Sequence, residues 1–280
     1  MIIVADSGST KADWKLISAQ GIESVGTMGF NPVFHSSEVI KRELDKALGG
    51  KINRDEATHV YYYGSGCWDK KRQDIVSNAL RQVFSHADVE VEHDLLGAAR
   101  ATCGDQPGIA CILGTGSNSC LFDGNDVIDN VTNLGYLVGD EGSGTYIAKK
   151  LIRAYFYREL PAELVEALEQ AVPGGKDEIL DRLYGPEPPN VYLASFTRFM
   201  GAHRDHFFVQ KMLYDSFADF IDRHIRKYRG HLSMPIHFIG SIAFTFQDLI
   251  KIALQERDLQ PGIFIKKPID QLVSFHTQEQ

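Results

Sequence analysis

The sequence predicts an α/β protein with two domains, each built on a mixed sheet, and three observations lead to this prediction. The chain has 280 residues, which is about the size at which a single core stops growing. Apolar strand-like segments alternate with amphipathic helical segments, as expected for a sheet with helical crossovers. A strand, a turn of small polar residues and a second strand open the chain and recur at residues 109–122, which indicates a duplicated architecture.

The predicted domain boundary follows this repeat. We expect an N-terminal domain over residues 1–107 and a C-terminal domain over residues 108–280, whose last few residues could pack back on the N-terminal domain. In the N-terminal part the expected strands are residues 2–5, 12–17, 60–63 and 89–93, and the expected helices are residues 36–48, 70–84 and 95–101. Ligands of such sheets bind beyond the carboxyl ends of the strands.

The C-terminal part repeats the opening pattern and then becomes largely helical. The expected strands are residues 109–113, 119–122, 236–239 and 263–265. The expected helical regions are residues 145–157, two helices within 162–183, one or two within 191–228 with a break near Gly201, one amphipathic helix ending at Leu254, and a terminal turn over 268–275. The glycines and acids of residues 133–144 run into one of these helices, so capping of its N-terminus would account for the acids.

The opening turn has the residue types of a phosphate site. Gly8 permits a sharp turn, and backbone amides together with Ser9, Thr10 and Lys11 could hold phosphoryl oxygens. Asp6, at the end of the first strand, is a hard oxygen ligand suited to Mg²⁺. An ordinary polar hairpin uses the same residue types, so this turn alone does not decide between the two interpretations.

Composition narrows the classes of function. The formal net charge is −8, which argues against nucleic acid as the main partner because a polyanion requires clustered Lys and Arg. The sequence begins with neither a signal peptide nor a membrane span, so we expect a cytoplasmic protein without a membrane partner. The four cysteines form no C-x-x-C pair, which favours reduced, mostly buried thiols.

Three strand ends in order resemble the nucleotide clamp of the actin, sugar kinase and Hsp70 superfamily. They are Asp6-x-Gly8-x-Thr10, residues 114–118 and Gly240-Ser241. Residues 114–118 together with 139–144 resemble, more narrowly, the N-acetylglucosamine kinase and BadF/BadG/BcrA/BcrD ATPase group. The resemblance extends from Ile2 to about Leu249 and implies a two-domain actin-like ATPase (ribonuclease H-like) fold with an interdomain cleft.

The resemblance implies ATP and Mg²⁺ as cofactors and gives roles to individual positions. Asp94 aligns with the general base that accepts the proton of the sugar hydroxyl, although an Asp at a strand end before a helix is commonly only a cap. Asp6 would belong to the Mg²⁺ shell. The implied nucleotide-binding residues are Ser9, Thr10, Lys11, Thr115 and Gly116 at the phosphates, Gly240 and Ser241 at the adenosine, and, more weakly, Gly201 near the base.

The resemblance also implies a set of acceptor residues, mostly amides and carboxylates able to bond neighbouring hydroxyls. This set is Asn31, Ser117, Asn118, Asn133, Leu134, Gly135 and Asp140. Leu134 stands where the animal enzymes have tryptophan and Asn133 where they have glycine, so the sugar could be another hexosamine or carry a larger substituent. Ser65 is a further candidate for the wall of the sugar site, with a plain turn serine as the alternative.

These residues favour one function over two others. The first hypothesis is an ATP-dependent kinase of amino-sugar metabolism that phosphorylates a hydroxyl of N-acetylglucosamine or a related N-acetylhexosamine. The second is a BadF/BcrA-like ATPase activator with a [4Fe-4S] cluster bridging two subunits, which the cysteine positions disfavour. The third is a sugar-binding regulator without catalysis, which the presence of Asp6, Lys11, Thr115 and Asp94 disfavours. Aromatic residues in the helices after Tyr146 are compatible with a homodimer.

Overall fold

The structure, a computed structural model, describes residues 1–8, 11–49 and 53–278. The chain divides into two compact units, which are described separately below. Unit 1 consists of Met1–Asp105 and Pro268–Gln280, and unit 2 consists of Gln106–Lys267. In the part of the chain that the structure describes, no helix is both long and apolar enough to cross a membrane.

Unit 1 is built on a five-stranded mixed sheet in the order β3-β2-β1-β4-β5. Its strands are β1 Ile2–Ser7, β2 Lys11–Ser18, β3 Gly21–Met28, β4 His59–Gly64 and β5 Asp88–His93. The first three strands are antiparallel, while β4 and β5 continue parallel to β1. Its helices are α1 Ser37–Leu48, α2 Lys70–Val83, α3 Asp94–Cys103, α13 Ile269–Gln278 and the 3₁₀ turn Arg54–Glu56.

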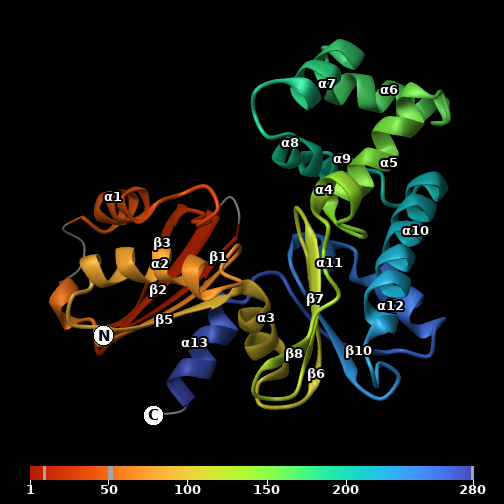
Figure 1. Cartoon of the computed structure of the whole chain (residues 1–280). Coiled ribbons are helices and arrows are strands. Elements are labelled where there is room, and N and C mark those ends of the chain that lie inside the picture. The colour runs from red at the N-terminus through yellow and green to blue at the C-terminus, as the bar shows by residue number, and fades with distance from the viewer. Residues whose placement is uncertain (9–10, 50–52, 279–280) are drawn as a thin grey trace. The chain divides into compact units, whose positions relative to one another are not determined.

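Helices cover both faces of this sheet, with α1 and α2 on one face and α3 and α13 on the other (Figure 1). The sequence accounts for this layering. In β1 the three consecutive residues Ile3, Val4 and Ala5 are fully buried, as expected for a central strand covered on both sides. In α1 the buried residues Ile40, Leu44 and Leu48 recur every fourth position and form one apolar stripe toward the sheet.

Unit 2 repeats the sheet of unit 1. Its strands are β6 Gly108–Leu113, β7 Ser117–Phe122, β8 Val127–Asp129, β9 Pro235–Ile239 and β10 Gln260–Ile265. The order β10-β9-β6-β7-β8 is the order of unit 1 with each strand replaced by its counterpart five strands later. The strands β6, β7 and β8 are again antiparallel, and β9 and β10 are again parallel to β6. The predicted α/β class with duplicated mixed sheets is thereby confirmed.

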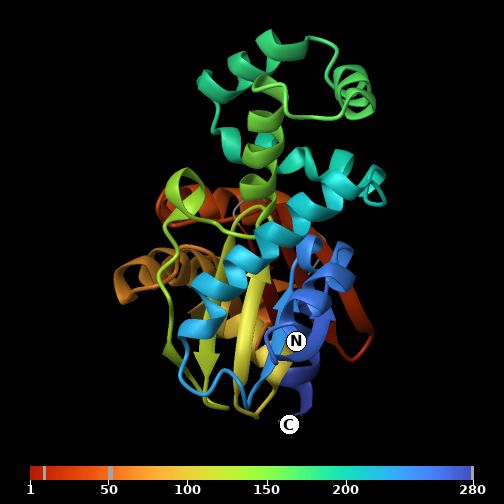
Figure 2. The same ribbon diagram turned by 90° about the vertical axis from the view of Figure 1, so that its right-hand side faces the viewer.

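The helices of unit 2 fall between β8 and β9 and between β9 and β10. They are α4 Gly135–Val138, α5 Gly144–Phe156, α6 Ala162–Ala171, α7 Gly175–Tyr184, α8 Pro189–Ser195, α9 Thr197–Ala202, α10 Phe207–Arg223, the 3₁₀ turn Ile225–Lys227, α11 Ser241–Thr245 and α12 Gln247–Gln255. Within this unit, α6 and α7 lie beyond the end of the sheet, away from its strands (Figures 1 and 2).

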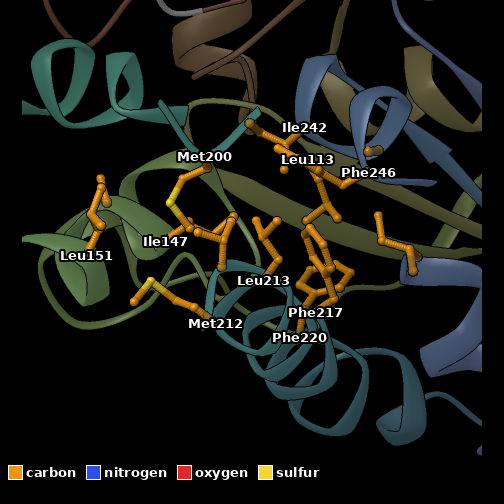
Figure 3. Packing of buried hydrophobic residues seen from close by; sticks show 14 of the residues in the cluster. Leu113, Ile147, Leu151, Met200, Met212, Leu213, Phe217, Phe220, Ile242 and Phe246 are labelled. Atoms are coloured by element: carbon orange, nitrogen blue, oxygen red, sulfur yellow. The ribbon is translucent and has the colours of Figure 1, made fainter. Parts of the chain in front are cut away.

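The core of unit 2 joins its sheet to α5 and α10. Figure 3 shows side chains of α10 packed between residues of α5, the end of β6 and the segment from α11 to α12. The labelled members are Leu113, Ile147, Leu151, Met200, Met212, Leu213, Phe217, Phe220, Ile242 and Phe246. Because this core holds α5 in place, the glycine-rich segment of residues 133–144 is anchored where it enters the helix.

Several elements differ from the sequence-based expectation. The strands β3 and β8 and the short helix α4 were not predicted. The strand expected from residue 119 begins at Ser117. The single amphipathic helix expected up to Leu254 is two helices that meet at Phe246, and the region 191–228 has an additional break at Phe196.

Candidate active site

The carboxyl ends of the parallel strands lie in register in each unit. In unit 1, Ser7 of β1 pairs with Gly64 of β4, which in turn pairs with His93 of β5. The predicted site residues Asp6, Ser65 and Asp94 stand at or directly beside these three strand ends. Since neighbouring strands are about 4.8 Å apart, the sheet brings all three residues to one edge of unit 1.

In unit 1 the antiparallel strands β1 and β2 lie on either side of the opening turn. The backbone N–H of Gly8 donates to the Lys11 carbonyl over 3.0 Å, so this amide is used inside the turn and does not point outward. Lys11 is the exposed first residue of β2. Asp6 pairs with Asp13 of β2 and Tyr63 of β4 in the sheet. The predicted phosphate ligands Ser9 and Thr10 lie outside the described residues.

Asp94 does not cap the helix that it begins. The N-cap of α3 is His93, whose ring Nδ1 accepts a hydrogen bond of 3.1 Å from the backbone N–H of Leu96. Asp94 is half-buried, and burial raises the pKa of its carboxyl group to about 6, although the backbone amides of Leu95 and Asp94 itself lower it. Asp94 is therefore not the N-cap residue of α3, although its carboxylate accepts from backbone amides of the first turn. Its perturbed pKa is of a kind that is more frequent at functional sites.

A buried phenol connects the two carboxylates of unit 1 electrostatically. The pKa of Tyr62 is raised mainly by burial, with further contributions from Cys67, Asp6 and Asp94. Burial also raises the pKa of the Cys67 thiol to about 12, and the Asp94 charge adds to this shift. Asp6 and Asp94 thus lie within electrostatic reach of one side chain, while Cys67 remains a neutral thiol.

The predicted acceptor residues of unit 1 meet around Ser7. The hydroxyl of Ser7 accepts from the backbone N–H of Phe30 over 2.9 Å, and its carbonyl accepts from the N–H of Ser65, also over 2.9 Å. Gly66 has φ +84°, and a Cβ atom there would lie 2.4 Å from the side-chain Oδ1 of Asn31. The structure thereby brings Asn31 and the Ser65 turn together. The Ser65 hydroxyl oxygen is buried and has no hydrogen-bond partner within residues 1–8, 11–49 and 53–278.

In unit 2 the β6–β7 turn is fixed to the start of α5. The Gly114 N–H donates to the Gly116 carbonyl over 2.9 Å and closes the turn. The Gly144 N–H donates to the Gly114 carbonyl over 2.9 Å, and the Thr145 N–H donates to the Thr115 carbonyl over 3.1 Å. The predicted phosphate residues Thr115 and Gly116 are therefore presented by a braced loop.

The predicted adenosine residues lie beside this turn. Gly240 has φ +118°, and a Cβ atom there would lie 2.2 Å from the carbonyl oxygen of Leu113, so only glycine fits. Ser241 is the exposed first residue of α11. Gly201 lies in α9 with open space beside its Cα, and no recorded contact joins it to the turn.

Asp140 is the centre of the predicted acceptor residues in unit 2. It is buried, has φ +61°, and its Oδ1 accepts from the Asn133 side-chain amide over 2.7 Å and from the Ser117 N–H over 3.3 Å. Its Oδ2 accepts from the Thr145 hydroxyl over 3.5 Å and lies 3.0 Å from where a Cβ of Gly116 would be. Burial raises the pKa of Asp140 despite these donors.

The capping explanation fails for Asp140 as well. The N-cap of α5 is Ser143, whose hydroxyl accepts from the Tyr146 N–H over 3.2 Å. The neighbouring acid Glu141 has another use, since its carboxylate lies 3.2 Å from Nε2 of buried His224. Asp140 is thus held by the Asn133 amide, the Ser117 backbone N–H and the Thr145 hydroxyl, and it is not the N-cap residue of α5.

The other predicted acceptor residues of unit 2 differ in their contacts and in their exposure to solvent. The Asn133 side chain also accepts from the Gly135 N–H over 2.7 Å, which folds the segment before α4. Leu134 is 64% exposed. The Asn118 side-chain oxygen accepts from Asn130 and the Ser119 N–H, and no recorded contact joins it to Asp140. The Ser117 hydroxyl is buried without a partner among the residues that the structure describes.

Sequence reasoning did not single out Thr145, His93 or Lys149. Thr145 bonds to Asp140, His93 caps α3, and the Lys149 ammonium bonds to the Tyr136 carbonyl of α4. None of them belongs to a recognisable motif. Only the fold shows that His93, at the end of β5, lies beside Asp94, and that Thr145 and Lys149 of α5 contact Asp140 and α4.

The residues present fit a divalent cation only with help from a ligand. Within the described ranges, no three His, Cys, Asp or Glu side chains converge to hold a metal ion. Asp6 could supply one oxygen, and phosphate oxygens and water would have to supply the others, which is the usual coordination of Mg²⁺. All four cysteines, Cys67, Cys103, Cys111 and Cys120, are buried.

No protein-family model matches the chain. No curated protein matches it either. Solved structures do match. The chain is 37% identical to a candidate N-acetylglucosamine kinase from Porphyromonas gingivalis, with 99% of each chain covered and a TM-score of 0.93.

Two more distant structures share the fold. One is a candidate N-acetylglucosamine kinase from Chromobacterium violaceum, with 16% identity, 98% of each chain covered and a TM-score of 0.71. The other is a ROK family glucokinase from Streptomyces griseus, solved with glucose and AMPPNP, with 16% identity, 99% of this chain and 98% of that chain covered and a TM-score of 0.56. Together with the braced turns and the strand order, the 37% identity shows that the chain belongs to the N-acetylglucosamine kinase-like family of the actin-like ATPase superfamily.

Proposed function

We propose that this protein is an ATP-dependent sugar kinase that transfers the terminal phosphoryl group of ATP to a hydroxyl of N-acetylglucosamine or a related N-acetylhexosamine. The observation that carries the proposal is the state of Asp94, a half-buried carboxylate that has a pKa raised to about 6 and is not the N-cap residue of its helix. Membership of the family supports the same reaction.

Asp94 acts as the general base. With a pKa of about 6 its carboxylate is mostly ionised at neutral pH and more basic than an ordinary aspartate. The sugar hydroxyl oxygen attacks the γ-phosphorus, the bond to the β,γ-bridging oxygen breaks, and the hydroxyl proton passes to Asp94. ADP and the sugar phosphate are the products. Phosphoryl transfer depends mainly on positioning and charge stabilisation, so one oriented carboxylate is sufficient protein chemistry.

The remaining residues bind and position the substrates. Lys11, Thr115 and Gly116 contact phosphates, with Ser9 and Thr10 assigned to the same role. Gly240 and Ser241 lie against the adenosine. Mg²⁺ held through Asp6 and the phosphates would neutralise charge on the transferred group.

Sugar recognition is assigned to the acceptor residues named above. They are Asn31, Ser65, Ser117, Asn118, Asn133, Gly135 and Asp140. Two of these residues, Ser65 and Ser117, have buried hydroxyl oxygens without a recorded partner, and such groups are normally satisfied by a ligand or water. The exposed side chain of Leu134, close to Asp140 in the chain, favours an acceptor with an apolar substituent such as an N-acyl group.

The buried cysteines favour a kinase over an ATPase activator. An activator of that kind must present thiolates at a subunit interface to hold a shared cluster, and all four thiols of this chain are buried. For Cys67 and Cys103, burial also raises the pKa, to about 12 and about 11, which disfavours the thiolate that ligates iron.

Coupled measurement of ADP release over a panel of sugars tests the proposal. The panel contains N-acetylglucosamine, N-acetylmannosamine, N-acetylmuramic acid, glucosamine and glucose. We expect sugar-dependent ADP release that is highest with an N-acetylated sugar and is lost in Asp94→Asn. ADP release that no sugar stimulates would contradict a kinase and would support the ATPase alternative.

A further inference from the structure

Unit 2 contains a cavity that no predicted site residue lines. Its volume is about 560 Å³, which is within the usual range for small-molecule sites. One face of α5 forms a wall, α7 and α8 contribute others, and Tyr136 and Leu137 of α4 complete the lining. The cavity therefore lies against the helix that is bracketed by Asn133 and Asp140.

The charged side chains around this cavity are all cationic. Lys149, Lys150 and Arg153 line it, and no Asp or Glu does, although the whole chain carries a net charge of −8. Asp219 neutralises Lys150 over 2.9 Å. For the Arg153 guanidinium, which is exposed, no hydrogen bond or ion pair is recorded among the described residues. Burial lowers the pKa of the Lys149 ammonium, nearby Asp140 and Glu141 raise it, and Arg153, one turn further along α5, lowers it.

The rest of the lining is aromatic and apolar. It includes Tyr146, Phe156, Tyr157 and Tyr184, and the last two are 70% and 85% exposed. The Lys150 ammonium lies 4.8 Å from the centre of the Tyr146 ring. Single exposed aromatic residues are common on protein surfaces, but a group of them around a cationic cavity matches a ligand with a flat apolar body and an acidic group.

Lys149 connects the cavity to the sugar-binding segment. Its ammonium donates to the backbone carbonyl of Tyr136, in the middle of α4. Three residues before Tyr136, Asn133 donates to Asp140 over 2.7 Å. An anion bound between Lys149 and Arg153 would compete with the Tyr136 carbonyl for the ammonium and would loosen α4.

We infer that this cavity binds a small organic anion, such as a carboxylate, sulfonate or phosphate on a planar apolar body, and that its binding weakens the grip of the Asn133–Asp140 segment on the sugar. The effect on the sugar rests on the proposed function, whereas binding of the anion does not. By thermodynamic linkage, the sugar must weaken anion binding by the same factor.

The first arm of the test measures binding without sugar or ATP. Titration of the full-length protein with 8-anilinonaphthalene-1-sulfonate, followed by fluorescence, should show one saturable site. Arg153→Ala should raise its Kd about tenfold, because one charge-assisted contact is lost. The matched control Arg229→Ala removes an exposed arginine that does not line the cavity and should leave the Kd unchanged.

Equal affinity of wild type and Arg153→Ala would overturn the proposal. If the affinity for the sulfonate rises when the protein is diluted, a second copy of the chain occupies the cavity at higher protein concentration. That result would also overturn the proposal.

The second arm measures coupling. In the ADP-release assay, the sulfonate should raise the KM for N-acetylglucosamine severalfold in wild type and not in Arg153→Ala, with the KM for ATP unchanged. A sugar KM that does not respond to a saturated cavity would overturn the coupling. If wild type shows no kinase activity with any sugar, the proposed function fails, while the first arm still decides whether the cavity binds the anion.

Discussion

The two units share one strand order but hold their key carboxylates in different ways. In unit 1, Asp94 begins α3 and is stabilised by the backbone amides of Leu95 and Asp94 itself, with its pKa raised to about 6. In unit 2, Asp140 is fixed by Ser117, Asn133 and Thr145. A carboxylate with few fixed partners can take up a proton, whereas one locked by several donors is suited to binding. In the proposed function, the same scaffold supplies a base in one unit and a binding anchor in the other.

The largest expected effect is loss of turnover in Asp94→Asn. An amide cannot accept the hydroxyl proton, so kcat should fall about 10²–10⁴-fold, which is the usual contribution of a general base. The KM values for sugar and ATP should change little, because Asp94 is proposed to act in the transition state. Steady-state kinetics with N-acetylglucosamine measure this. A kcat within threefold of wild type would remove Asp94 from the mechanism.

Asp140→Ala and Asp94→Ala should change the free energy of unfolding in different directions. Asp140→Ala leaves the Ser117 N–H and the Asn133 amide without their acceptor and places alanine at φ +61°, so we expect a loss of about 2 kcal/mol or more. Asp94→Ala should not be destabilising at neutral pH. The folded-state pKa of Asp94 is raised above 3.8, so its ionisation opposes folding increasingly from about pH 4 to 6 and fully above that range.

Urea unfolding of both variants at about pH 7.5, and again at about pH 4, measures this contrast. Any stabilising effect of Asp94→Ala should diminish at the lower pH, where the wild-type carboxyl group is protonated in the folded state. Equal destabilisation by the two substitutions would mean that Asp94 is also a structural anchor.

A smaller effect is expected when the N-cap residues of α3 and α5 are replaced. His93→Ala and Ser143→Ala should each lower stability by about 1 kcal/mol, since each removes an N-cap acceptor. Only His93→Ala should also lower kcat, because His93 caps the helix that begins with Asp94. His93→Asn, which retains a capping side chain, is the control and should recover most of the stability. An unchanged kcat in His93→Ala would show that Asp94 is positioned without its cap.

The sequence was sufficient to predict the strands and helices that have strong apolar patterns or glycine-rich ends. The strands β1, β4, β6 and β9 were predicted because they are apolar runs that end in small-residue turns, and β2 and β5 because apolar and polar residues alternate along them. The strand β3 was missed because, within Gly21–Met28, only Val25 is buried. The helix breaks at Phe196 and Phe246 contain neither glycine nor proline, and both aromatic side chains are buried, so packing and not local sequence sets these breaks.

For the site, the sequence indicated positions but not surroundings. The turns at Gly114–Gly116 and Gly240 could be located from their small residue types, and at Gly240 only glycine fits the backbone geometry. The sequence could not decide whether Asp94 and Asp140 were N-caps. His93 and Ser143, the N-caps in the structure, are close to them in the chain and also have side chains that can accept a hydrogen bond. Only the three-dimensional arrangement assigns each hydrogen bond to one of them.

The pH dependence of kcat/KM for N-acetylglucosamine tests the central claim most directly, because it reports the pKa of the essential base in the free enzyme. With Asp94 as the base, the profile should fall on its acid side with an apparent pKa near 6, and this limb should be absent from the residual activity of Asp94→Asn. A profile that stays flat down to about pH 4.5, or an acid limb that persists in Asp94→Asn, would contradict the assignment.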